Sequence, residues 1–255
     1  MTRVAIVLGA SRGIGRATAL HLSAKGYVTV LCARSQSDLE KVARETGGGQ
    51  VTCVLPGDIT SRSFRDELVY DVERRFGRID VLVNNAPGPA PSPFEDVRAD
   101  DVCSAMNQKL VPYLDLIKSA VPVMVRNEFG RIVNVVGNIG KEPASGMFLS
   151  GLVNAAISNA SKYLAGQYAK HNVTVNCVHP GVVQTQRYDQ AVHHMSGAEG
   201  ISQQEAEDRL RRTIPMDRPG HACEIAALIG FLASDESSYI TGQQISADGG
   251  QLKSV

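Results

Sequence analysis

Seven short apolar runs recur along the chain, and longer amphipathic stretches separate them. The runs cover residues 3–10, 27–34, 51–58, 79–86, 130–137, 173–181 and 243–250. Each is almost continuously apolar, which is typical of strands buried on both faces of a parallel sheet. The stretches between them have helical periodicity. From 62 to 76, for example, Phe64, Leu68, Val72 and Phe76 recur every four residues among charged side chains.

The alternation of strand and helix patterns predicts the fold class. We expect an α/β protein with a single doubly wound Rossmann domain over residues 1–255, in which helices cover both faces of a seven-stranded, mainly parallel sheet. One segment, at about 182–220, has no strand pattern and is rich in Gln, Arg, His and Asp. We expect it to form short helices that act as a substrate lid over the carboxyl edge of the sheet, where such folds bind ligands.

Composition narrows the partners. The 255 residues carry 26 basic and 26 acidic side chains, so the net charge is +0 and no strong field attracts nucleic acid or an anionic membrane. We expect neither as a partner. The five cysteines are scattered without a C-x-x-C pair, which indicates free thiols in a reducing compartment and no metal site. The amino terminus leads directly into a strand, and no apolar window is long enough to span a membrane, so we expect a cytoplasmic protein.

A glycine-rich turn follows the first predicted strand. The sequence "LGASRGIG" places Gly9, Gly13 and Gly15 where a helix begins. Glycine allows the backbone to approach a pyrophosphate, and the N–H groups at a helix amino terminus favour its charge. In this strand–helix–strand context the turn predicts a nucleotide site.

At this point the chain resembles the short-chain dehydrogenase/reductase family over essentially its whole length. The matching pieces are "GASRGIG", "GDIT", "NNA", "GRIVNV", "VNCVHPGVVQT" and "FLASDESSYITGQQISADGG". The resemblance implies four groups of cofactor-binding residues: Gly9, Ser11, Arg12, Gly13 and Ile14 at the phosphates and ribose, Asp58 and Ile59 at the adenine, Asn85 and Ala86 at the ribose, and Pro180, Gly181, Val183 and Thr185 at the nicotinamide carboxamide. Pro87 departs from the pattern, since the family usually has glycine there.

The second strand indicates which nicotinamide cofactor is used. An NAD site typically ends this strand with a carboxylate that binds the adenosine 2′-OH. Here the strand ends "LCARS", which places Arg34 at that position, and Arg12 lies in the glycine turn. Two guanidinium groups suit a 2′-phosphate, so the sequence predicts NADP(H).

The family's Ser-Tyr-Lys triad is missing from the positions that the flanking motifs define. Counted without a gap, the three positions hold Gly137, Ser150 and Asn154. The family also has an asparagine on the preceding helix that orders a water for proton relay, and we assign it to Asn107 of "AMNQKL". A shifted motif at Lys162 fails, because Ser158 rather than a tyrosine lies four residues before it. The catalytic candidates are therefore Asn107, Ser150 and Asn154.

Two interpretations remain open. The first is an atypical NADP(H)-dependent oxidoreductase that acts on a small carbonyl, hydroxyl or enone substrate with a non-standard proton donor. Its proton would come from water held by Ser150 and Asn107, or from one of four lid residues, Arg187, Tyr188, His193 and His194. The second is a catalytically silent cofactor-binding or regulatory protein. The intact dinucleotide motifs and the elaborate lid favour the first.

Three further expectations follow from the resemblance. Asn138 and Lys141 follow the fifth strand and are placed to face the cleft. The helix from about 149 to 169 and the "ITGQQISADGG" end resemble the family's association surfaces, which predicts a homo-oligomer, specifically a tetramer. A lysine introduced at Asn154 is expected to tighten NADPH binding, because it would have a ribose hydroxyl to bond.

Overall fold

The fold is built on one fully parallel sheet. The computed structural model describes residues 2–46 and 52–254, and its main sheet has seven strands in the order β3-β2-β1-β4-β5-β6-β9. These strands are β1 (Val4–Leu8), β2 (Val28–Ala33), β3 (Thr52–Pro56), β4 (Val81–Asn84), β5 (Gly130–Val135), β6 (Val173–Pro180) and β9 (Gln244–Ala247). Each lies in a predicted apolar run, although Val51 of the third run is outside the described residues. The predicted fold class is confirmed.

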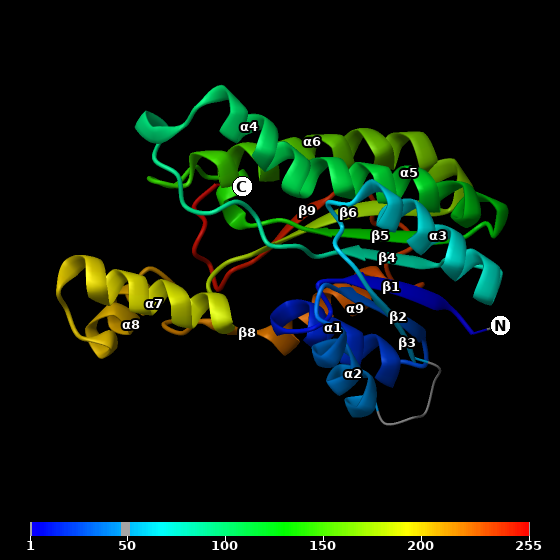
Figure 1. The fold of residues 1–255 in the computed structure, drawn as a ribbon, viewed down its shortest axis with the longest axis horizontal. Coiled ribbons are helices and arrows are strands. Elements are labelled where there is room, and N and C mark those ends of the chain that lie inside the picture. Colours follow the sequence, from blue (N-terminus) through cyan, green and yellow to red (C-terminus); the bar gives the residue numbers. More distant parts are fainter. Residues whose placement is uncertain (1, 47–51, 255) are drawn as a thin grey trace.

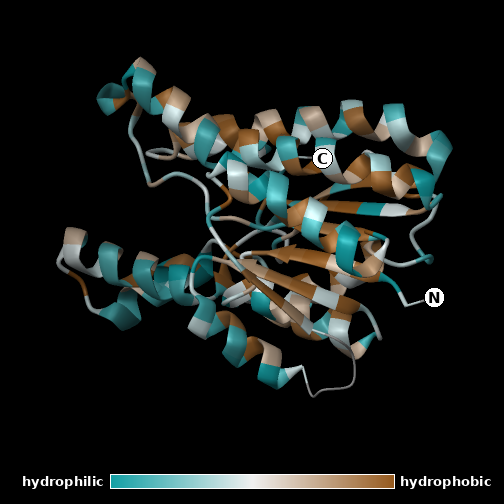
Figure 2. Ribbon diagram, turned by 45° about the vertical axis from the view of Figure 1, so that its right-hand side comes forward, coloured by the Kyte–Doolittle hydropathy of each residue, from teal (hydrophilic) through white to brown (hydrophobic). Residues whose placement is uncertain are grey.

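Helices cover both faces of this sheet (Figure 1). One layer holds α3 (Arg62–Phe76), α4 (Ala99–Ala105), α5 (Val111–Arg126) and α6 (Phe148–Tyr168), and the other holds α1 (Gly13–Ala24), α2 (Gln36–Glu45) and α9 (Ala222–Leu232). Strand side chains alternate between the two layers: Ile6 and Leu82 pack beneath α3 and α5, whereas Val7 and Val83 pack on the side of α1 and α9. Figure 2 shows the resulting hydrophobic interior between polar outer helix faces. Burial on both faces explains the continuous apolar runs.

The segment 182–220 projects beyond the carboxyl ends of the strands (Figure 1). It contains β7 (Val183–Gln184), α7 (Gln186–Glu199), α8 (Gln203–Arg212) and β8 (Gly220–His221). The helices agree with the expectation. The strands β7 and β8 pair with each other in a separate two-stranded sheet, and two residues are too few for a hydrophobic pattern to reveal.

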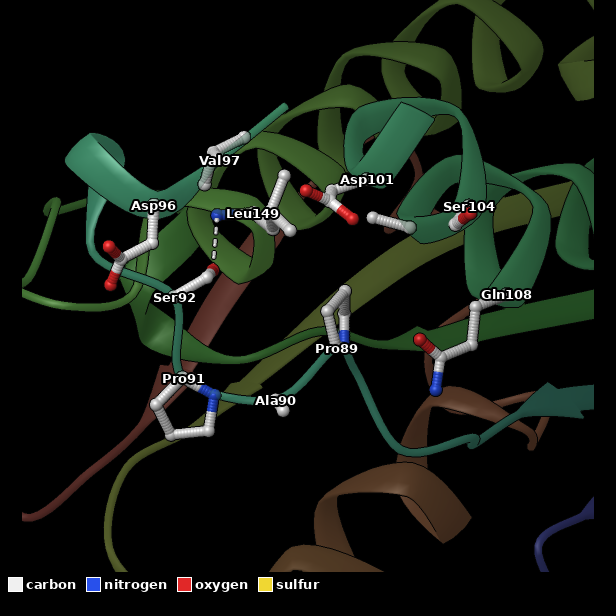
Figure 3. A pocket seen from close by; sticks show the side chains of 11 residues that line it. Pro89, Ala90, Pro91, Ser92, Asp96, Val97, Asp101, Ser104, Gln108 and Leu149 are labelled. Atoms are coloured by element: carbon white, nitrogen blue, oxygen red, sulfur yellow. Dashed lines mark hydrogen bonds between the residues drawn. The ribbon is translucent and has the colours of Figure 1, made fainter. Parts of the chain in front are cut away.

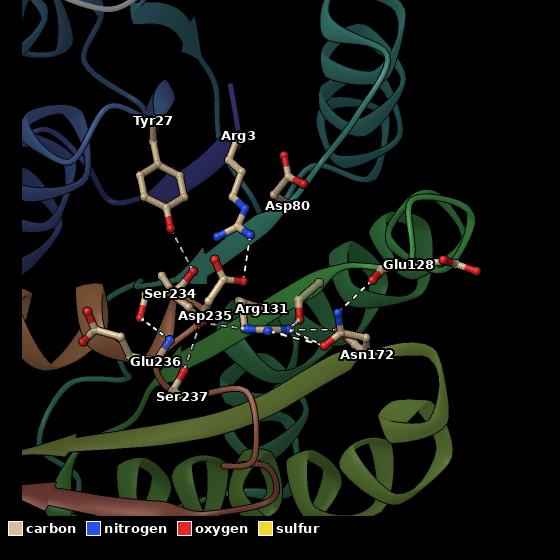
Figure 4. A network of polar contacts seen from close by, with 12 residues as sticks. Arg3, Tyr27, Asp80, Glu128, Arg131, Asn172, Ser234, Asp235, Glu236 and Ser237 are labelled. Atoms are coloured by element: carbon tan, nitrogen blue, oxygen red, sulfur yellow. Dashed lines mark hydrogen bonds and ion pairs between the residues drawn. The ribbon is translucent and has the colours of Figure 1, made fainter. Parts of the chain in front are cut away.

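A polar network closes the opposite, amino-terminal edge of the sheet (Figure 4). Arg131 is 1% exposed, and its guanidinium donates to the carbonyl oxygens of Asn172 at 2.9 Å and Ser234 at 3.1 Å. Nearby, Arg3 pairs with Asp235 at 2.8 Å. A buried charge is tolerated when it is hydrogen-bonded in this way. The network fastens β5, β6 and the segment after α9 together, and the carboxyl edge is left to bind ligands.

Two short irregular helices shape that carboxyl edge. A π-helix, η2 (Met106–Leu110), joins α4 to α5, and a 3₁₀-helix, η3 (Asn138–Gly140), follows β5. A π-turn carries one more residue per hydrogen-bonded loop than an α-turn, so it rotates the side chains around it. None of the described helices is both long and apolar enough to cross a membrane.

Candidate active site

The glycine turn forms a close-packed cradle at the end of β1. A Cβ on Gly9 would overlap the carbonyl oxygen of Asn85, and one on Gly15 would overlap the carbonyl oxygen of Gly9. Gly9 and Gly13 also have positive φ angles of 63° and 53°, which favour glycine. No side chain of the described residues caps the amino terminus of α1. Its N–H groups are therefore available to an anion, and the turn fits a pyrophosphate.

The end of the site that the resemblance assigns to the adenosine is cationic, and it contains one acid that the sequence reasoning did not place. Arg12 and Arg34 are both exposed, and the guanidinium of Arg12 donates to the Gln186 side chain at the start of α7. Asp38, in the first turn of α2, pairs with Lys41 at 2.9 Å. That hydrogen bond is the main cause of the lowered pKa of Asp38, and the charge of Arg12 adds to it. Since Lys41 neutralises Asp38, the two arginines still suit a phosphate.

A buried arginine holds the loop that the resemblance assigns to the adenine. Arg65 on α3 is 5% exposed and donates to the carbonyl oxygens of Ile59 at 2.6 Å and Thr60 at 2.9 Å. It also pairs with Asp115 on α5 at 2.7 Å. The pKa of Asp58 is lowered, chiefly by the hydrogen bond from the Thr60 N–H. Sequence reasoning missed Arg65, because a single arginine in an amphipathic helix gives no signal of burial.

Residues that the resemblance assigns to the ribose and to the nicotinamide lie at the same edge. The Ala86 N–H donates to the Tyr113 hydroxyl at 2.7 Å, which fixes the chain after β4. A Cβ on Gly13 would lie 3.3 Å from Cγ2 of Thr185, so the glycine turn and the start of α7 are neighbours. A Cβ on Gly181 would lie 2.7 Å from Cβ of Asp248, so only glycine fits there.

Ser150 lies beneath the loop that follows β4. It is 2% exposed, and its hydroxyl donates to the Pro89 carbonyl oxygen at 2.9 Å. A Cβ on Gly88 would lie 3.4 Å from the same hydroxyl oxygen. The loop therefore occupies the space into which a longer side chain at position 150 would extend.

Asn154 lies one helical turn further along α6 and faces Gly137. It is 4% exposed, and a Cβ on Gly137 would lie 3.2 Å from its amide nitrogen Nδ2. A serine at position 137 would crowd this amide. The absence of a side chain at Gly137 thus leaves room for the Asn154 amide.

The side chain that reaches Asn154 from the preceding helix is Lys109, which the sequence reasoning missed. Lys109 is 3% exposed, and its Nζ donates to Asn154 Oδ1 at 2.9 Å. Asn107, the residue assigned to this place from the sequence, is exposed on the same π-helix. The assignment of Asn107 came from the family resemblance, whereas in the structure Lys109, two residues later on this π-helix, contacts α6.

Lys109 is an uncompensated buried amine. Its pKa is lowered to about 7, chiefly by burial and also by the charge of Arg187 on α7, against a small opposing effect of Cys177. Within residues 2–46 and 52–254, no carboxylate lies within ion-pair distance of Lys109. Its ammonium does lie 5.6 Å from the centre of the Tyr113 ring. The amine therefore changes charge near neutral pH, where a small change in surroundings alters its protonation.

A buried histidine completes this polar cluster. His179 at the end of β6 is 0% exposed, and its Nδ1 lies 3.3 Å from the Gly137 carbonyl oxygen. Its Nε2 has no partner among the described residues. Burial is the main cause that lowers its pKa to about 4, and the charges of Lys141 and Lys109 contribute. At neutral pH this imidazole is therefore uncharged and carries a single ring N–H.

The other predicted cleft residues lie around the rim. Arg187, His193 and His194 are exposed on α7, and Tyr188 is half-buried beside them. Lys141 donates to the Ser246 hydroxyl at 3.3 Å, and Asn138 donates to the Gln251 side chain at 3.1 Å. Lys141 thus bonds β9 and Asn138 bonds the segment after it, while Arg187 has no ion-pair partner in the described part of the chain.

A cavity of about 270 Å³ adjoins the site (Figure 3). The loop of residues 89–92 forms one wall, and Asp101 and Ser104 of α4 form another. Leu149, the neighbour of Ser150, closes its base. Ser150 and Asn154 do not line it, so this cavity lies beside the predicted catalytic positions.

A doubly wound sheet with a glycine cradle at its switch point, a cationic adenosine end and a polar cluster at the nicotinamide end defines a dinucleotide-dependent oxidoreductase. The chain belongs to the short-chain dehydrogenase/reductase family. The family model described as enoyl-(acyl carrier protein) reductase matches residues 9–251.

Individual relatives agree with this assignment. The chain is 46% identical to the NADPH-dependent reductase BacG of Bacillus subtilis (strain 168), with 99% of each chain covered. It is 32% identical to the 3-oxoacyl-[acyl-carrier-protein] reductase FabG of Thermotoga maritima, with 97% of each covered. The crystal structure of YwfH, an NADPH-dependent reductase involved in bacilysin biosynthesis, matches with a TM-score of 0.96 and 44% identity over 100% of both chains. The expectation of NADP(H) as cofactor is confirmed at the level of these relatives.

Proposed function

We propose that this protein is an NADPH-dependent reductase that reduces a carbon–carbon double bond conjugated to a carbonyl group. In this reaction NADPH supplies a hydride. The glycine turn, Arg12 and Arg34 hold the phosphates, and Ala86, Gly181 and Thr185 surround the nicotinamide end. The relatives named above support the cofactor, and the description of the matching family supports an enoyl-type substrate.

The contact between Lys109 and Asn154 carries the proposal. In the pattern that the family resemblance implies, a lysine stands at position 154 and an asparagine on the preceding helix. Here the amine and the amide that contact each other come from the opposite elements. The ammonium belongs to Lys109 of η2 and the amide to Asn154 of α6, with Lys109 Nζ 2.9 Å from Asn154 Oδ1. The site therefore keeps a positive charge in the absence of the triad lysine, and its origin is Lys109. By donating to Oδ1, Lys109 also turns the Asn154 amide nitrogen toward Gly137.

This arrangement favours an enone over a simple ketone. Reduction of a ketone produces a strongly basic alkoxide, so an acid must deliver a proton to the oxygen as it forms. No tyrosine stands at position 150, and the Ser150 hydroxyl is committed to the Pro89 carbonyl oxygen. Conjugate reduction instead produces an enolate, a weaker base, which needs a nearby positive charge and can take its proton from water. A fixed ammonium in a low-dielectric site supplies that stabilisation.

The segment 182–220 is proposed to close over the substrate as a lid on the single domain. Its first helix, α7, starts beside the glycine turn, since Gln186 accepts a hydrogen bond from Arg12. Arg187 is close enough to Lys109 for its charge to lower the pKa of that amine. A substrate bound between α7 and η2 would thus be enclosed by residues of both helices.

A matched pair of ketones tests the proposed reaction. We expect NADPH oxidation, followed at the reduced-nicotinamide absorbance band, with benzylideneacetone but not with its saturated counterpart benzylacetone. With deuterated NADPH, the label should appear at the carbon β to the carbonyl. Deuterium at the carbinol carbon would contradict conjugate reduction. Tight NADPH binding without turnover of any enone would favour a silent cofactor-binding protein instead.

Cofactor preference depends on Arg34. We expect the protein to bind NADPH at least 10-fold more tightly than NADH, because a guanidinium–phosphate hydrogen bond contributes about 1.5–3 kcal/mol. Arg34→Ala should remove most of this preference and leave NADH affinity nearly unchanged. Titration of both nicotinamides by fluorescence measures the effect. An alanine variant that discriminates as well as the parent would show that the 2′-phosphate lies elsewhere.

We also propose a homo-tetramer. Tyr163 on α6, one of the elements expected to associate, is 66% exposed, and Tyr239, immediately before the other at 240–250, is fully exposed. We expect a mass near four times 27.3 kDa by light scattering at micromolar concentration. A monomeric mass would contradict the tetramer without affecting the proposed reaction.

A further inference from the structure

Three cationic side chains converge on the proposed site from separate elements. Lys109 comes from η2, Lys141 from the turn that ends η3, and Arg187 from the first turn of α7. Lys109 Nζ lies 2.9 Å from Asn154 Oδ1, and Lys141 Nζ lies 3.3 Å from the hydroxyl of Ser246, which pairs with His179 across β6 and β9. Arg187 follows Thr185, which lies against the glycine turn at Gly13, and its charge acts on Lys109. The three groups therefore surround one region at the carboxyl edge of the sheet.

Among the described residues, none of these three cations has an acidic partner. Elsewhere on the lid, Arg209 pairs with Glu205 at 2.9 Å, and Arg218, near the end of the lid, pairs with Glu224 at 2.6 Å. In the described ranges, by contrast, Lys109 bonds an amide and Lys141 bonds a hydroxyl. Arg187 has no hydrogen-bonded or ion-paired partner there. The site thus presents three positive charges, and no carboxylate of the described residues is bonded to any of them.

We propose that the substrate carries a carboxylate and that Arg187 binds it. This inference rests on the proposed reductase function and specifies its substrate class: an acid whose conjugated carbonyl oxygen faces Lys109 while its carboxylate meets the arginine of the lid. Guanidinium is the side chain best suited to a carboxylate, because its planar fork can donate two parallel hydrogen bonds. The exposed position of Arg187 on α7 suits a residue that engages substrate as the lid closes.

The placement also gives Arg187 a second effect on the reaction. With no anion present, its charge opposes protonation of Lys109. A carboxylate bound to Arg187 would neutralise that charge and favour the ammonium form of Lys109. The substrate would thereby help to charge the group that stabilises its own enolate.

An acid and its ester test the inference. The probes are trans-benzoylacrylate and its methyl ester, which share the same enone and differ in one negative charge. We expect kcat/KM for the acid to exceed that for the ester by about 10- to 100-fold. Arg187→Met should collapse this ratio toward one, whereas Arg187→Lys should retain part of it, because an ammonium keeps the charge without the fork. Lys170→Met, which removes a cation from η4 (Ala169–His171), is the matched control and should retain the full ratio.

A binding measurement separates this inference from the proposed reaction. Benzoylpropionate, the saturated acid, should bind the NADP⁺-loaded protein by calorimetry, and Arg187→Met should weaken it by about 10- to 100-fold. Arg187-dependent binding of the acid without turnover of any enone would contradict the reaction and support the carboxylate site. Equal turnover of acid and ester would support the reaction and overturn the carboxylate site. Weaker NADPH binding by Arg187→Met, with an unchanged acid-to-ester ratio, would assign Arg187 to the cofactor and also overturn it.

Discussion

Replacement of Lys109 by methionine should abolish reduction and stabilise the fold at the same time. We expect kcat/KM for an enone to fall by about 10²–10³-fold, the usual loss when one preorganised stabiliser of a developing negative charge is removed. NADPH binding should change little, because Lys109 bonds Asn154 and not the cofactor-phosphate residues. Methionine fills a similar volume without a charge to bury.

The stability gain follows from the pKa of Lys109 in the folded and unfolded states. Its pKa is about 7 in the folded protein and 10.5 in an unfolded chain, so the unfolded state binds more protons between these pH values. Stability of the parent protein therefore rises with pH across this window, and the cost of the buried charge is largest below pH 7. At about 1.4 kcal/mol per pKa unit, that cost is of the order of a few kcal/mol. Lys109→Met should raise the melting temperature by several degrees near pH 6 and by much less near pH 10.

The same titration predicts a pH-dependent rate. The groups that face Lys109 are Arg187 on α7, Cys177 and His179 on β6, and Tyr113 on α5. Cys177 and Tyr113 have raised pKa values because they are buried, and His179 is neutral, so Lys109 is the member that titrates near neutrality. We expect kcat/KM to decline as pH rises above about 7, when the ammonium loses its proton. Lys170→Met should show the parent's profile and melting temperature. A Lys109→Met variant that keeps full activity, or is less stable at pH 6, would contradict the proposed role.

The strands, their parallel order and the cofactor cradle could be predicted because they depend on local patterns. A strand buried on both faces needs a continuous apolar run, and a turn that meets pyrophosphate needs glycine, so both features are visible along the chain. Gly137, Ser150 and Asn154 are counted from neighbouring motifs, and their assignment to the triad positions stays a prediction. Their chemistry could not be predicted, because it depends on what other segments place against them.

Lys109 shows why the rest could not be predicted. A lysine among the apolar residues of "MNQKLVPYL" is indistinguishable from a lysine on the outer face of a helix until the register is known. The π-helix η2 sets that register, and no sequence rule identifies a single π-turn. The loop over Ser150 is similar: Pro89 and Ser150 are 61 residues apart, and only the folded chain brings them together.

The proposed exchange of Lys109 and Asn154 can be tested by reversing it, and for the single Asn154→Lys change the contact with Lys109 predicts the opposite of the tighter NADPH binding expected from the sequence. Asn154→Lys alone should destabilise the protein and weaken NADPH binding, because it would place a second ammonium against Lys109 in a buried site. The double variant Lys109→Asn/Asn154→Lys removes this repulsion and restores the amide–ammonium pair with its members interchanged. We expect the double variant to be more stable than Asn154→Lys by at least about 2 kcal/mol, with a coupling energy of about 1–3 kcal/mol in the full cycle.

Thermal denaturation and NADPH titration of all four proteins in the cycle measure both effects. The double variant should bind NADPH about as tightly as the parent, since a lysine at 154 could then bond a ribose hydroxyl without a charged neighbour. Its enone reductase activity should exceed that of Lys109→Met, because a positive charge has returned to the site. Additive effects of the two substitutions would show that Lys109 and Asn154 act independently. Tighter NADPH binding by Asn154→Lys alone would show that the ammonium of Lys109 does not lie against position 154 when the cofactor is bound.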